Sequence, residues 1–206
     1  IFLSSVITDI NSMIDKMFAS NCGMGIVSTL SYATNIKTVT LIIAAGILTV
    51  LFPKISKKYV ERNFTEFKKL ITKSLLVIIG IYVPITIVFI IFSKEIVKIV
   101  YFRGAFDLDS LTKTSLCLKM YIIGIMGISI RDLYIKALYC MEKGKFVIVI
   151  SAISVITNIV LNIIFFEKIG YAGLPFATSL SVWIIIPIII GYYKGSVRKQ
   201  EEIINY

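Results

Sequence analysis

Several polar residues occur inside otherwise apolar segments, where together they could hold a hard cation. Asp15 supplies a carboxylate in the first apolar segment, and Thr178 supplies a hydroxyl in the last. Asn158 and Asn162 are four residues apart, so both amides project from one face of a helix. A proline follows Leu174 and is expected to free a backbone carbonyl near it. This oxygen set suits a hard monovalent cation.

A second interpretation of the same residues is structural. Asparagine and threonine side chains commonly form hydrogen bonds between membrane helices, each worth ~0.6–2 kcal/mol. Asp15 could equally be a charge at the membrane interface. The spacing alone leaves the cation site and these alternatives open.

Basic residues inside apolar segments form the second group of candidates. Arg131 and Lys136 lie toward the end of one segment, and Lys37 begins the apolar part of another. Either their long side chains reach the membrane interface as anchors, or they line a cavity that receives an anionic head group. Arg131 and Asp132 are adjacent and about 100° apart around a helix. That angle predicts that the two do not pair directly.

The composition places these residues in a membrane protein. The 206 residues are 57% hydrophobic and only 17% charged, whereas soluble domains average about a quarter charged residues. There is no histidine, and the three cysteines (Cys22, Cys117 and Cys140) form no CxxC motif, so they are interpreted as packing residues. Neither a P-loop nor a GxSxG motif occurs. We therefore expect a protein that is not an enzyme.

Apolar runs of about 20 residues predict an all-α, polytopic membrane bundle of about six helices. The expected spans are near residues 1–19, 27–53, 74–92, 111–139, 146–166 and 171–193. Kinks are expected at three prolines within them, Pro84, Pro175 and Pro187. The chain begins inside an apolar run, which suggests a fragment of a longer protein.

The basic residues predict how the spans are oriented. Thirteen lie in the 54–73 loop, the link around 136–145 and the tail, against five in the opposite links. Basic residues favour the cytoplasmic side, so residue 1 and the C-terminus are expected there, with 194–206 as a tail or linker. The net charge of +10 is thus explained by topology rather than by nucleic acid. The basic loop could also bind anionic lipids.

Two shorter helices are expected at the membrane surfaces. Residues 62–73 combine apolar positions at helical spacing with lysines, which predicts an interfacial helix on the cytoplasmic leaflet. Ile96, Val97 and Val100 predict a shorter one on the outer face. Gly104 provides a turn after it, and Asp107 or a nearby polar residue is expected to cap the next helix.

Several segments, in order along nearly the whole chain, resemble the MurJ/MviN family of bacterial lipid II flippases. They are Ser31–Ala33, Leu48–Ser56, Phe102–Phe106 (the "RGAF" loop), Lys136–Tyr139 with Arg131 upstream, Asn158–Asn162, Ala172–Leu174 and Ala177–Trp183. The resemblance implies the second, C-terminal six-helix lobe of a two-lobed flippase in the bacterial cytoplasmic membrane. Its partners would be membrane lipids and the N-terminal lobe that this chain lacks.

In that family a cationic cavity between the lobes holds the pyrophosphate of a lipid-linked muropeptide, lipid II, during alternating access. The resemblance implies that Arg131, Lys37, Asn35 and Lys136 lie at the substrate. It also implies a sodium site formed by Asp15, Asn158, Asn162, the Leu174 carbonyl and Thr178. No organic cofactor is expected.

Two positions depart from the family pattern. Asn35 stands where the family usually has arginine, and Asn162 stands where some relatives carry a second carboxylate. Lys37 could replace the lost arginine from a different direction. Two alternative functions therefore stay open: flipping another lipid-linked oligosaccharide or acting as a related exporter, and acting as a non-transporting scaffold for cell-wall enzymes.

Overall fold

The computed structural model describes residues 10, 13–20, 22–23 and 25–204, and these residues contain helices and no strand. A helix covers residues 13–20. It is followed by α2 (Ile26–Val60), α3 (Phe64–Ile91), α4 (Ser93–Tyr101), α5 (Leu108–Cys140), α6 (Gly144–Ile169), a short 3-10 turn η1 (Gly170–Ala172) and α7 (Gly173–Ile204). The expected all-α bundle is confirmed. Most of the expected first span, residues 1–9 and 11–12, lies outside the described residues.

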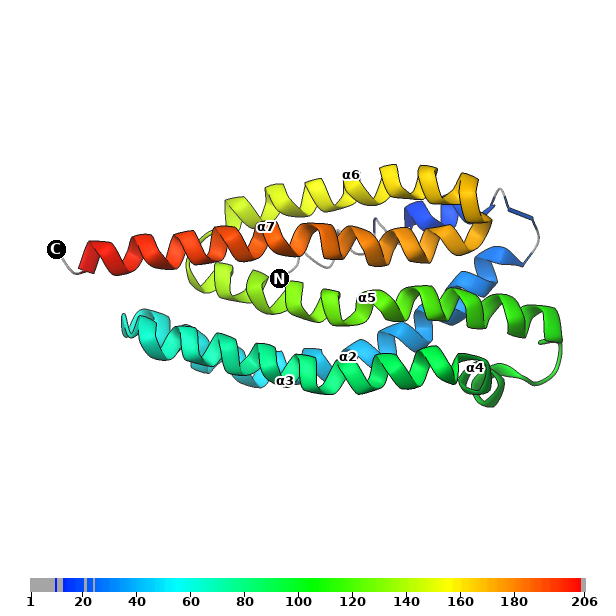
Figure 1. Ribbon diagram of the computed structural model, residues 1–206, viewed down its shortest axis with the longest axis horizontal. Coiled ribbons are helices and arrows are strands. Elements are labelled where there is room, and N and C mark those ends of the chain that lie inside the picture. Colours follow the sequence, from blue (N-terminus) through cyan, green and yellow to red (C-terminus); the bar gives the residue numbers. More distant parts are fainter. Residues whose placement is uncertain (1–9, 11–12, 21, 24, 205–206) are drawn as a thin grey trace.

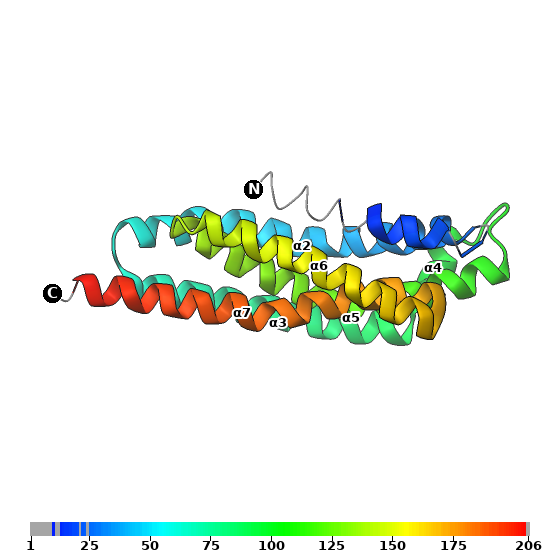
Figure 2. The ribbon, with the colours of Figure 1, turned by 90° about the horizontal axis from the view of Figure 1, so that it is seen from above.

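The long helices lie side by side along one axis, with α5 in the middle (Figures 1 and 2). Helices α6 and α7 lie on one side of α5, and α2 and α3 lie on the other (Figure 1). Three helical stretches among the described residues are long and apolar enough to cross a membrane: Ile26–Val60, Phe64–Ile91 and Gly144–Glu202, the last including α6 and most of α7. Such helices satisfy their own backbone groups, as lipid requires.

Close packing of α5 against α7 depends on small residues and on hydroxyls that bond to backbone. A Cβ added at Gly124 would lie 2.6 Å from the Ser179 Oγ and 2.8 Å from its Cα. The Ser179 hydroxyl donates to the Met120 carbonyl over 2.6 Å, and the Trp183 indole N–H donates to the Ile123 carbonyl over 3.0 Å. Small residues that let backbones approach are typical of membrane helix interfaces.

A tyrosine hydroxyl is inserted into the backbone ladder of α2. Tyr82 of α3 is fully buried. Its hydroxyl donates to the Thr40 carbonyl over 3.0 Å and accepts from the Ala44 N–H over 3.2 Å. These two groups would otherwise bond to each other in a regular helix. The insertion ties α3 to α2 at one level of the bundle while both backbone groups remain satisfied.

The expected interfacial helix near residues 62–73 is not a separate element. Helix α3 runs from Phe64 to Ile91 without interruption, and its N-terminus is capped by the Asn63 side chain, which accepts from the Glu66 N–H. Phe67 and Ile71 are buried within the lobe, at 0% and 2% exposure. The apolar residues that suggested a membrane-surface helix therefore pack against the protein.

Figure 1 places the 61–63 link, the 141–143 link and the C-terminal end of α7 at the same end of the bundle. An ion pair of 2.5 Å between Lys68 and Glu201 joins α3 to α7 there. The three most basic segments of the chain thus lie at one end of the bundle. The predicted topology requires this, because it places all three on the same side of the membrane.

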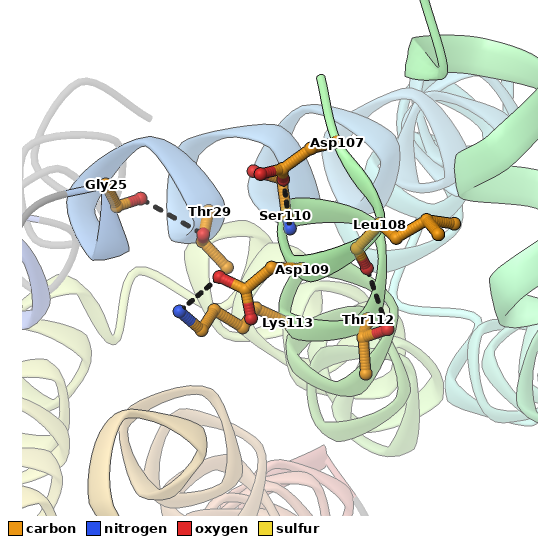
Figure 3. A network of polar contacts seen from close by, with 8 residues as sticks. All are labelled: Gly25, Thr29, Asp107, Leu108, Asp109, Ser110, Thr112 and Lys113. Carbon is orange, nitrogen blue, oxygen red and sulfur yellow. Dashed lines mark hydrogen bonds and ion pairs between the residues drawn. The ribbon is translucent and has the colours of Figure 1, made fainter. Parts of the chain in front are cut away.

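The opposite end carries α4 and the start of α5. Helix α4 lies across the axis of the long helices (Figure 1) and buries Val97. Gly104 adopts a φ of 60°, which glycine accepts without strain. The Asp107 carboxylate then caps α5 by accepting from the Ser110 N–H over 2.8 Å (Figure 3). That bond holds the pKa of Asp107 below its usual value.

The packing of α5 on α7 makes a testable prediction. Gly124→Ala should destabilise the fold by about 1–3 kcal/mol, because the added methyl group meets backbone as well as side-chain atoms of Ser179. Thermal unfolding of the full-length protein in detergent measures the effect. Gly46→Ala in α2 is the matched control, because nothing lies within 4 Å of its Cβ position. Equal melting temperatures for the two variants would contradict this account.

Candidate functional site

A buried carboxylate joins three helices at the polar cluster that the sequence suggested. Asp15, on the helix at residues 13–20, is only 3% exposed. Its Oδ1 accepts from the Asn162 amide of α6 over 2.7 Å, and its Oδ2 accepts from the Thr178 hydroxyl of α7 over 2.8 Å. Asp15 is therefore in direct contact with two residues that lie 147 and 163 positions later in the chain. We call Asp15, Asn158, Asn162 and Thr178 the Asp15 cluster.

Both asparagines of α6 take part in this cluster and are fully buried. The Asn162 amide donates to the Asn158 Oδ1 over 3.4 Å, and the Asn158 amide donates to the Thr178 hydroxyl oxygen over 3.3 Å. The four-residue spacing thus places both amides on one face, as predicted. The cluster closes on itself as a network of side chains from three helices.

The cluster leaves hydrogen-bonding capacity unused in a way that suits a cation. The Asn162 Oδ1 is buried without a hydrogen-bond partner, although buried polar atoms nearly always have one. The Thr178 hydroxyl has a single proton but lies within bonding distance of both Asp15 Oδ2, at 2.8 Å, and the Leu174 carbonyl, at 3.1 Å. The oxygen acceptors around Asp15 therefore outnumber the protons that can be donated to them. A hard cation uses such oxygens as ligands.

The expected role of Pro175 is wrong. Helix α7 begins at Gly173, so Pro175 lies in its first turn, where a missing N–H breaks no intrahelical bond. A proline removes the donor of the carbonyl four residues before it, which for Pro175 is that of Tyr171, so it does not free the Leu174 carbonyl. The Leu174 carbonyl lies 3.1 Å from the Thr178 hydroxyl oxygen. Leu174 belongs to the cluster only through that hydroxyl.

The four residues expected at the substrate do not gather at one point. The Lys37 ammonium of α2 lies 4.3 Å from the ring centroid of Tyr121 on α5. Arg131 is ten residues further along α5, a rise of about 15 Å, and Lys136 follows it. Asn35 is exposed on α2. Arg131 and Lys136 therefore lie further along α5 than the contact between Lys37 and Tyr121.

Sequence reasoning missed the contact between Lys37 and Tyr121. A cation over an aromatic face is stabilised by the ring quadrupole, more so where water is scarce. No spacing rule could reveal it, since the two residues lie on different helices. Lys37 is also within electrostatic range of Asp15 and of Arg131. Its charge therefore interacts with both groups.

Arg131 and Asp132 pair directly, contrary to the expectation from their angular separation. The guanidinium Nε and Nη2 both donate to Asp132 Oδ1, over 3.0 and 2.9 Å. The expectation was based on the directions of the two Cα–Cβ bonds, which differ by about 100° around the helix. The arginine side chain is long enough to bend around the helix surface and reach its neighbour, so those directions do not decide the contact.

The remaining motif residues lie away from these groups. Arg103 and Phe106 of the RGAF loop line a pocket at the α4 end of the bundle, together with Tyr32 and Tyr101. The three cysteines are free thiols, and Cys117 is fully buried, in line with packing roles. Among the described residues no group of three or more histidine, cysteine, aspartate or glutamate side chains could hold a metal ion. The Asp15 cluster accordingly has one carboxylate, and its other oxygens belong to amide, hydroxyl and carbonyl groups.

Solved structures share the arrangement of these helices. The chain superimposes on "Lipid II flippase MurJ, inward closed conformation" with a TM-score of 0.83 and 25% identity, over 97% of this chain and 43% of that one. It also matches "Crystal structure of MATE in the straight conformation" with a TM-score of 0.78 and 16% identity, over 91% of this chain and 41% of that one. The second likeness concerns the fold alone.

Curated relatives carry a consistent name. A "Lipid II flippase MurJ" of Burkholderia cenocepacia is 25% identical over 84% of this chain and 34% of its own length. A "Probable lipid II flippase MurJ" of Helicobacter pylori is 29% identical over 87% of this chain and 40% of its own length. The chain spans between 32% and 40% of the length of such relatives.

The family model described as "Lipid II flippase MurJ" matches residues 1–204, which is nearly the entire sequence. Together with the shared helical fold and the ordered motifs, this match establishes that the chain belongs to the MurJ family.

Proposed function

We propose that the full-length protein translocates lipid II across the cytoplasmic membrane by alternating access, and that this chain supplies one of its two lobes. The family match over residues 1–204 carries the proposal. A head group bearing a pyrophosphate cannot enter hydrocarbon unaided, and arginine or lysine beside it offsets the loss of hydration. Lys37 and Arg131 are half-buried cations suited to this role.

Reconstitution tests this function directly. The full-length protein in vesicles that contain lipid II with a labelled head group should make inner-leaflet head groups accessible from outside. Lys37→Ala should slow this step by roughly tenfold or more, because it removes a charge-assisted contact in a low-dielectric site. Lys199→Ala, an exposed residue of the tail, serves as the control.

Folded protein that moves no lipid II in this assay would contradict the proposal. It would favour the scaffold hypothesis, whereas movement of a different lipid-linked oligosaccharide would favour a related flippase.

We further propose that the Asp15 cluster binds a sodium ion. The Asp15 carboxylate, the unpartnered Asn162 oxygen and the Asn158 and Thr178 oxygens would be its ligands. The ion would neutralise a carboxylate that is otherwise costly to bury. It would also hold three helices together, which is how ion binding can affect the shape of the lobe.

Melting of the full-length protein with and without sodium tests this site. A ligand that binds only the folded state raises its stability, so sodium should raise the melting temperature of the wild type. Asp15→Asn or Thr178→Ala should remove most of that rise, while Thr157→Ala, an exposed hydroxyl on the same α6, should leave it intact.

Asn162→Asp offers a test in the opposite direction. A second carboxylate should strengthen cation binding and shift the stabilisation to lower sodium concentrations. A melting temperature that does not respond to sodium, in the wild type and in Asn162→Asp, would remove the ion from the mechanism.

We also infer that the basic end of the lobe faces the cytoplasm. Lys57 lies at this end and Asp109 at the other, and both side chains are exposed. In a background without the three native cysteines, an impermeant thiol reagent should label Asp109→Cys on intact cells. It should label Lys57→Cys only after permeabilisation. The reverse pattern would invert the proposed topology.

A further inference from the structure

The Arg131–Asp132 pair has a geometry that the proposed transport step does not yet use. Both donated bonds come from one edge of the guanidinium and end on a single carboxylate oxygen, Asp132 Oδ1. The guanidinium carries five N–H donors, and the described residues accept from no other donor of Arg131 than these two, so the rest could bind a second anion. No hydrogen bond to Asp132 Oδ2 occurs within the described part of the chain.

The two partners differ in their access to water. The Arg131 side chain is 18% exposed, whereas the Asp132 side chain is 43% exposed. A half-buried guanidinium without a counter-charge would be costly, so Asp132 stabilises Arg131 when no other anion is present. The carboxylate itself can be hydrated if it loses the arginine. Separation of the pair therefore costs less than it would for two buried ions.

A second cation, Lys136, lies where it could pair with the Asp132 carboxylate. Lys136 lies four residues after Asp132 on α5, one helical turn away. An acidic residue four positions before a lysine is the favourable order for a pair on a helix surface. Among the described residues, the carboxylate is paired with Arg131 and not with Lys136.

We propose that Asp132 is the internal counter-ion of Arg131 and that the diphosphate of the substrate competes with it for the guanidinium. This inference rests on the proposed function. Asp132 holds the arginine in the unloaded state, and on arrival of the diphosphate it turns toward water and Lys136. Asp132 is a positioning residue that acts through Arg131 and need not contact the substrate.

The physical consequence is a limit on how tightly the head group binds. An uncompensated arginine in a low-dielectric cavity would hold a diphosphate strongly and release it slowly. Competition from a tethered carboxylate weakens the loaded state and offers the arginine a partner at the moment of release. A carrier requires such balance, because binding must favour entry and still permit exit.

Binding of inorganic pyrophosphate to the full-length protein, measured by calorimetry at fixed ionic strength, tests the inference. Asp132→Asn should tighten binding roughly tenfold, because it removes the competing charge but preserves the size of the side chain. Asp132→Glu should stay close to the wild type. Asp109→Asn removes an exposed carboxylate elsewhere on α5 and is the control for a general change of charge.

The decisive comparison is Asp132→Asn in a background of Arg131→Ala. If Asp132 acts through the arginine, the tightening should disappear there, with less than about a twofold change. The same tightening without Arg131 would show a long-range field effect and would overturn the inference. So would weaker or unchanged pyrophosphate binding in Asp132→Asn alone.

Transport kinetics supply a second readout that a purely structural role would not produce. Asp132→Asn should lower KM for lipid II and also lower kcat, since release becomes slower. Failure of the intact protein to move lipid II would end the proposed function. The pyrophosphate cycle would still decide the role of Asp132, so the two failures can be told apart.

Discussion

A carboxylate that is buried in an apolar bundle must find donors within the protein, and Asp15 finds them on two other helices. Its two oxygens accept from Asn162 on α6 and from Thr178 on α7. Any shift of the first helix relative to these two would separate a buried charge from its donors, which is far more costly than sliding apolar surfaces past each other. The position of this helix in the lobe therefore depends on three polar side chains.

Helix α5 provides the frame against which this cluster is held. It packs between the α2–α3 pair and the α6–α7 pair. Gly124 allows α7 to approach closely, and the Ser179 and Trp183 bonds to α5 carbonyls fix the level at which the two helices meet. Since Thr178 is next to Ser179, the same register that packs α7 on α5 also presents the Thr178 hydroxyl to Asp15.

Much of this arrangement could be predicted from the sequence, because it depends on the helical periodicity of the residues and on whether lipid or water surrounds them. The lengths of the apolar runs predicted the helices, and the distribution of lysine and arginine predicted that the basic segments lie at one end of the bundle. The four-residue spacing of Asn158 and Asn162 placed both amides on one face. In a membrane helix such polar residues stand out from their surroundings, so the partners of Asp15 were few and could be named in advance.

The wrong and missing predictions have a common physical origin. Residue spacing gives the direction of the Cα–Cβ bond, but it gives neither the position of the side-chain end nor the group that the side chain contacts. Arg131 reaches Asp132 across an angle that Cβ directions exclude. Phe67 and Ile71 carry the pattern of a membrane-surface helix, but the surface that they cover is protein. The contact of Lys37 with Tyr121 joins two helices whose relative rotation no local pattern specifies.

The location of Lys37 connects the two proposed binding events through charge. It lies within electrostatic range of both the Asp15 carboxylate and the Arg131 guanidinium. A sodium ion at Asp15 would offset the negative charge of that carboxylate, which would leave more of the lysine's positive potential available to an anion. By linkage, an anion near Lys37 and Arg131 would then favour the cation by the same factor. Coupling between ion and head group thus requires no contact between their sites, only a shared neighbour in a medium that screens poorly.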